Sequence, residues 1–133
     1  MTTELHWMTL TVLMTALFWV PYILDRMVTR GIPATISGAV PEGGAPQSPW
    51  AQRAIKAHAN AVENLAIFVP AVLAAHVLAV STPATQMAAA VYFFARLAHF
   101  VVYTAGLPAV RTLAFAVGWG AQIVIIASVL GWL

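Results

Sequence analysis

The sequence predicts an all-α integral membrane protein whose single domain, residues 1–133, is an up-down bundle of four transmembrane helices. Hydrophobic residues make up 62% of the chain and charged residues only 8%, whereas about a quarter of a soluble domain is charged. Four apolar runs each approach or exceed the roughly twenty residues that a helix needs to cross a bilayer. Proline and glycine separate these runs. The chain is therefore expected to face lipid over most of its surface.

The first helix is expected at about residues 5–28. Its apolar run is longer than the core of a signal peptide, and it follows Glu4 instead of a basic segment, so we expect a retained span. Pro21 should bend this helix near its end. Residues 29–49 hold eight of the chain's prolines and glycines and predict the one sizeable loop.

The other three helices are expected at about residues 50–80, 84–105 and 108–133. Ser48-Pro49 is typical of an N-cap followed by proline in the first helical position. Ser81-Thr82-Pro83 repeats this pattern, which predicts a tight hairpin between the second and third spans. Gly106 is expected to cap the third helix.

The positive charges predict the orientation of the bundle in the membrane. Lys and Arg flank the first loop and follow the third span, whereas residues 81–85 carry no charge. Because cytoplasmic loops are enriched in these residues, the first and third loops are expected on the cytoplasmic side. The short loops and many alanines favour a bacterial inner membrane.

Composition also excludes several kinds of function. The net charge is only +2 and no basic run exists, so nucleic acid is not an expected partner. The chain has no cysteine, which excludes a disulfide and a thiolate metal site. We expect no metal, and any sulfur chemistry must arrive with a ligand.

Polar residues repeat at helical spacing on the second and third helices. Residues three and four positions apart lie on one side of a helix. The stripe on the second helix contains Arg53, Lys56, Asn60 and Glu63, and the stripe on the third contains Arg96, His99 and Tyr103, extended by Tyr92. The second helix starts on the cytoplasmic side and the third ends there, so both stripes should lie in the cytoplasmic half of the bundle.

These charges have two interpretations. Residues near the ends of the spans could be interfacial anchors whose charged groups reach water; they are Asp25, Arg26, Arg30, Arg53 and Lys56. Glu63 lies about 20 Å into its helix, and a charge at such depth costs at least ~2–3 kcal/mol. Glu63 and Arg96 therefore each need a partner or a wet cavity, and an ion pair between them would suffice. Basic residues at the helix N-termini, such as Arg111, would be favoured by a bound anion.

Two segments resemble the signatures of the MAPEG family, the membrane-associated proteins of eicosanoid and glutathione metabolism. Residues 53–64, RAIKAHANAVEN, resemble the family's second-helix motif. Residues 95–103, ARLAHFVVY, followed by Pro108 and Arg111-Thr112, resemble its motif across the third and fourth helices. Length, four spans and the long first loop agree, so the resemblance covers essentially the whole chain.

The resemblance implies a homotrimer with a glutathione site between neighbouring subunits, near the cytoplasmic side. It implies a glutathione-dependent transferase or peroxidase that acts on lipophilic electrophiles. Arg111 and Thr112 would lie closest to the sulfur, with Tyr103 beside them. The residues implied to bind glutathione are Arg26, Arg53, Lys56, Asn60, Glu63, Arg96 and His99.

The sequence departs from the family pattern at Ala59, where glutathione-using members commonly carry arginine. Thr112 stands where some members have serine. Ala59 favours an alternative: a non-catalytic small-molecule binding protein, or an accessory subunit of a membrane complex. A haem carrier using His58 with His99 is a third hypothesis, although His58 falls on the face opposite the polar stripe. A transporter is a fourth, but the chain lacks the broken helices and repeated halves often seen there.

Overall fold

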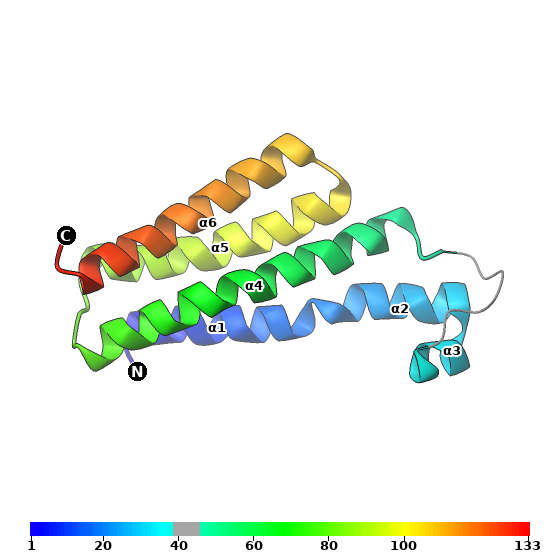
Figure 1. Ribbon diagram of the computed structural model, residues 1–133, viewed down its shortest axis with the longest axis horizontal. Helices are drawn as coiled ribbons and strands as arrows, with labels where there is room; N and C mark the ends of the chain where they lie inside the picture. The colour runs from blue at the N-terminus through cyan, green and yellow to red at the C-terminus, as the bar shows by residue number, and fades with distance from the viewer. Residues whose placement is uncertain (39–45) are drawn as a thin grey trace.

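The computed structural model describes residues 1–38 and 46–133, and in this part of the chain every regular element is helical. The helices are α1 (Thr3–Leu17), α2 (Trp19–Arg30), α3 (Ile32–Ser37), α4 (Pro49–Val77), α5 (Pro83–Ala105) and α6 (Pro108–Val129). Helices α1 and α2 form one rod, so four segments are long and apolar enough to cross a membrane (Figure 1). The predicted all-α fold with four candidate spans is confirmed.

The first rod is interrupted at Phe18, between α1 and α2. Pro21 has no N–H to donate to the carbonyl of Leu17, and its ring crowds that carbonyl. The Phe18 N–H bonds to Thr15 O at 3.2 Å, a tighter turn than the α-helix makes. The disturbance expected from Pro21 therefore falls one turn before it.

The ends of the other helices differ from the predicted bounds by a few residues. Helix α4 ends at Val77, before the predicted 80, because Ala79 adopts a left-handed conformation with φ 56°. The Val80 N–H then returns to Ala75 O at 2.8 Å, which closes the helix end. Gly131, with φ 77°, ends α6 in the same way before the predicted 133.

The start of α5 and the long loop show one agreement and one difference. Thr82 and Thr85 form a capping box, and Gly106 caps α5 with φ 81°, as the sequence predicted. The expected loop of residues 29–49 instead contains α3 and the last residues of α2. Its residues 39–45, with Pro41, Gly43 and Gly44, lie outside the described part.

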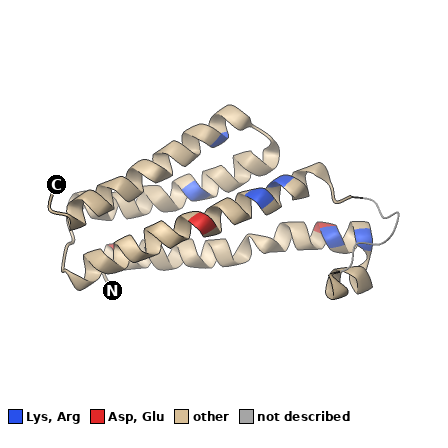
Figure 2. Ribbon diagram, in the orientation of Figure 1, with Lys and Arg blue, Asp and Glu red and all other residues tan. Residues whose placement is uncertain are grey.

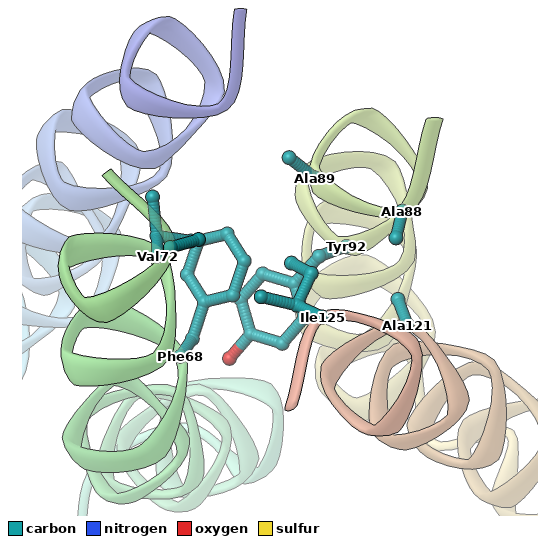
Figure 3. Close-up of a cluster of buried hydrophobic side chains, with 8 residues drawn as sticks. Phe68, Val72, Ala88, Ala89, Tyr92, Ala121 and Ile125 are labelled. Atoms are coloured by element: carbon teal, nitrogen blue, oxygen red, sulfur yellow. The ribbon is translucent and has the colours of Figure 1, made fainter. Parts of the chain in front are cut away.

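Helices α5 and α6 form an antiparallel hairpin, and α1 and α4 both pack against α5 and against each other (Figure 1). The main core cluster lies where α4, α5 and α6 meet, and the Phe68 and Tyr92 rings stack there with centroids 3.8 Å apart (Figure 3). A second cluster contains Phe18 stacked on Phe100, beside Ala54, Ala57 and Ala61 of α4. Small residues let membrane helices approach closely, which explains the row of buried alanines.

Charged residues are concentrated in the half of the bundle nearest the long loop and the α5–α6 turn (Figure 2). At the opposite end, the buried Glu4 carboxylate accepts hydrogen bonds from Ser81 and Thr85. At this end the Glu4 carboxylate therefore connects the start of α1 to the start of α5, and both of its oxygens are hydrogen-bonded. The polar half holds the candidate site.

Candidate functional site

A polar cavity of about 270 Å³ lies between α4, α5 and α6 in the charged half of the bundle. Its lining combines an amide, an imidazole, a phenol, a guanidinium, a hydroxyl and one phenyl ring; these are Asn60, His99, Tyr103, Arg111, Thr112 and Phe115. A larger hollow of about 460 Å³ between α5 and α6 is lined by apolar side chains. Polar chemistry is therefore assigned to the smaller cavity.

Arg96 of α5 binds the side chain of Asn60 but does not itself line the cavity. It is 2% exposed, and its Nη2 donates to Asn60 Oδ1 at 2.7 Å. Its Nε has no hydrogen-bond partner among the described residues, and neither does the buried Nδ1 of His99. Buried polar atoms usually find a partner, so this region has unused hydrogen-bonding capacity.

Aromatic side chains support the cationic group on the opposite wall. The Arg111 guanidinium carbon lies 4.3 Å from the Tyr103 ring centroid, which is close enough for a cation–π contact. The His99 ring meets Tyr103 edge to face at 5.6 Å and lies 6.2 Å from the Phe115 ring. Thr112 donates its hydroxyl to Pro108 O at 3.0 Å. One guanidinium group, that of Arg111 from α6, therefore lines the cavity, and a second, that of Arg96 from α5, binds the lining residue Asn60.

The stripe on α4 splits into two faces. Residues seven apart differ by only about 20° around a helix. Arg53 and Asn60 therefore share one face of α4, and Lys56 and Glu63 share the neighbouring face. The first pair contacts α5, through Arg53 Nε to Thr104 O at 2.9 Å and Asn60 to Arg96. Lys56 and Glu63 are exposed in the single chain. Only half of the predicted stripe thus contributes to contacts inside the bundle.

The ion pair between Glu63 and Arg96, which would suffice to partner both charges, is not formed in this chain. Arg96 instead bonds to the neutral Asn60, and Glu63 points away from α5, as its exposure indicates. Arg53 also has a partner that the sequence did not reveal. It binds the carbonyl end of α5, where a positive charge is favourable, and a Cβ on Gly106 would lie 3.3 Å from its guanidinium.

Arg26 contributes to a different structure in the single chain. Its Nε donates to Gln47 Oε1 at 3.0 Å, and Asp25 accepts from the Ser48 N–H and hydroxyl. Ser48 is the N-cap of α4, as predicted, but its hydroxyl binds Asp25 instead of capping the helix. Together these four residues hold the end of α2 against the start of α4. Arg26 is not among the residues that line the cavity.

His58 faces the first span. Its Nδ1 lies 2.8 Å from the Tyr22 hydroxyl, and its ring meets Phe18 edge to face. This contact agrees with the predicted separation of His58 from the polar stripe and leaves no support for a His58–His99 haem pair. No group of three or more His, Cys, Asp or Glu side chains suited to a metal occurs in residues 1–38 and 46–133.

Three residues of this region were missed as candidates from the sequence. Phe115 lines the cavity, and Asn64 and Gln122 connect Asn60 to α6. A signal existed for two of them. Asn64 follows Asn60 by one helical turn, and Gln122 is an amide inside an apolar helix, where polar side chains are costly.

The four apolar helices are those of a multi-pass integral membrane protein, and a polar cavity lies between three of them. The profile of the MAPEG family matches residues 5–131, nearly the whole chain. The protein therefore belongs to the MAPEG family. No curated protein and no solved structure matches it.

Proposed function

We propose that the protein is a membrane-bound, glutathione-dependent transferase or peroxidase acting on lipophilic electrophiles. The observation that carries this proposal is a polar cavity that is lined by Arg111 and has no carboxylate among its six lining residues, with Arg96 bonded to the lining residue Asn60. Such a cavity favours an anion. Family membership supports glutathione as the anion, because glutathione carries two carboxylates and an ionisable thiol.

The residues divide between holding the peptide and activating its sulfur. Asn60 and Arg96 can bind a carboxylate through charge-assisted and amide hydrogen bonds, and His99 Nδ1 has capacity for one more bond. Arg111, in the first turn of α6, would stabilise a thiolate, which is the reactive form of a thiol. Thr112 must turn its hydroxyl away from Pro108 O before it can donate to the sulfur. Tyr103 keeps Arg111 in place.

The proposed conjugation is a nucleophilic substitution. The thiolate sulfur attacks an electrophilic carbon, a carbon–sulfur bond forms, and the leaving group departs with its electron pair. With a hydroperoxide, the thiolate attacks the terminal oxygen, the O–O bond breaks, and the alkoxide leaves and takes up a proton to become the alcohol. The thiol of a second glutathione then attacks the resulting sulfenic acid, so that water leaves and the disulfide forms. The apolar helix surfaces give a lipophilic cosubstrate access from the bilayer.

We further propose that the site is completed by neighbouring copies in a homotrimer. The cavity of about 270 Å³ lies just below the usual range for small-molecule pockets. On α4, Glu63 is exposed near the middle of a candidate membrane span, where an unpartnered charge costs about 2–3 kcal/mol or more, and Lys56 is exposed on the same face. A second copy against this face would remove that cost. It would also bring Glu63 to a ligand ammonium group, and Arg26 to a site that its own chain does not form.

Binding of glutathione to the detergent-purified protein tests the proposal. Calorimetry should show saturable binding, with thiolate absorbance appearing in parallel. In an activity assay with glutathione, the protein should consume the electrophile chlorodinitrobenzene or the peroxide cumene hydroperoxide. Ala59, exposed on α4, supports the second candidate, a non-catalytic binding protein or accessory subunit. Absence of binding at millimolar glutathione would favour that candidate, and binding without turnover would favour a binding protein.

A further inference from the structure

Three residues with amide side chains, Gln122, Asn64 and Asn60, here called the amide relay, connect α6 to the cavity through side-chain and backbone hydrogen bonds. Gln122 is 1% exposed, and its Nε2 donates to the backbone oxygen of Asn64 at 3.1 Å and to the Tyr92 hydroxyl at 3.3 Å. Asn64 Nδ2 donates to Asn60 O at 2.9 Å and to Asn60 Oδ1 at 3.3 Å. Gln122 is therefore connected through Asn64 to an amide in the cavity wall.

Gln122 holds three helices at one point. Its two donors reach α4 and α5 from α6. An amide costs free energy in an apolar helix unless its polar atoms are bonded, so Gln122 favours the arrangement in which both donors are used.

The relay also determines which end of the Asn60 amide faces the cavity. Asn64 Nδ2 and Arg96 Nη2 both donate to Asn60 Oδ1, and an amide nitrogen cannot accept these bonds. Asn60 Oδ1 is thus directed toward its two donors. The NH₂ group of Asn60 remains available to an acceptor in the cavity, such as a carboxylate oxygen.

We propose that Gln122 is a positioning residue that fixes Asn64, and through it the Asn60 amide and the Arg96 guanidinium, for binding of a ligand carboxylate. The identity of the ligand rests on the proposed function. The arrangement of the relay does not. Because Gln122 acts through Asn64 and lies outside the lining of the cavity, it should affect binding of the peptide more than the reaction at sulfur.

The test compares Gln122→Met, which keeps the shape and removes both donors, with Ser128→Ala. Ser128 is also buried on α6, but its hydroxyl donates only to Val124 O in the same helix. Gln122→Met should raise the Kd for glutathione about three- to tenfold, the loss expected for one or two such hydrogen bonds, with kcat nearly unchanged. Asn64→Ala should weaken binding similarly, and the double variant no further. Wild-type affinity in Gln122→Met, or an equal loss in Ser128→Ala, would overturn the proposal.

A second measurement needs no ligand. In a double-mutant cycle on thermal unfolding in detergent, Gln122→Met and Asn60→Ala should together lower Tm by less than the sum of their separate effects, because each breaks the same relay. Additive losses would overturn the positioning role. If the wild-type protein did not bind glutathione, the proposed function would fail while this cycle still decided the role of Gln122.

Discussion

Replacing Arg111 with alanine should separate stability from thiol activation. In the structure Arg111 contacts the Tyr103 ring at 4.3 Å and makes no ion pair with any described residue. A partly exposed cation–π contact contributes about 0.5–1 kcal/mol, so Arg111→Ala should lower Tm by only a few degrees. The effect on a bound thiolate is expected to be much larger.

The size of the effect follows from the charge. A cation within about 4–6 Å lowers the pKa of an acid by about 1–3 units, and an ordinary thiol has a pKa near 8.5. A lowering of about two units leaves roughly three-quarters of the bound glutathione as thiolate at pH 7. Without Arg111 the thiolate fraction falls to about 3%, so turnover at pH 7 should fall about 25-fold. Because the thiol pKa rises in the variant, its activity should recover as the pH increases past about 8.5.

The assay is the pH dependence of kcat with a water-soluble aryl halide, together with the thiolate absorbance of the glutathione complex. Arg111→Lys is the matched control, because it keeps the charge and should retain most of the activity and the wild-type pH profile. Full turnover at neutral pH in Arg111→Ala, with an unshifted profile, would refute the assignment of Arg111 to the sulfur.

Three further substitutions test other features. Glu63→Gln should increase the population of monomers in detergent, measured by light scattering, because a neighbouring copy is proposed to cover this charge; an unchanged population would contradict that interface. Glu4→Ala leaves the hydroxyls of Ser81 and Thr85 without their carboxylate acceptor and should destabilise the fold by about 1–3 kcal/mol, with glutathione affinity unchanged; weakened binding would show that the two ends are coupled. Gly106→Ala should lower Tm more than Gly131→Ala, since both have positive φ but only at position 106 would the added Cβ crowd a neighbour, the Arg53 guanidinium; equal losses would mean that this crowding contributes nothing.

Local sequence signals predicted the helices well because they act over a few residues. The proline starts, the Thr82 cap and the left-handed Gly106 depend on their nearest neighbours, and each lies where the sequence placed it. The end of α4 was predicted too late, because Ala79 gives no sign of its positive φ.

The candidate site was only partly predictable, because a stripe does not reveal how a helix is rotated against its neighbours. A rotation of α4 by less than a quarter-turn decides that Asn60, and not Glu63, meets Arg96. Likewise, the distance in sequence between Arg53 and Thr104 hides the fact that a charge at the start of one helix satisfies the carbonyl end of another. Partners of this kind depend on the packing of whole helices.

The clamp of Asp25 and Arg26 on Gln47 and Ser48 joins two helices that are distant in sequence. These side-chain bonds hold the start of α4 directly against the end of α2, so the two helices are connected by more than the covalent chain. Homologous chains should therefore preserve the four clamp residues together with the start of α4.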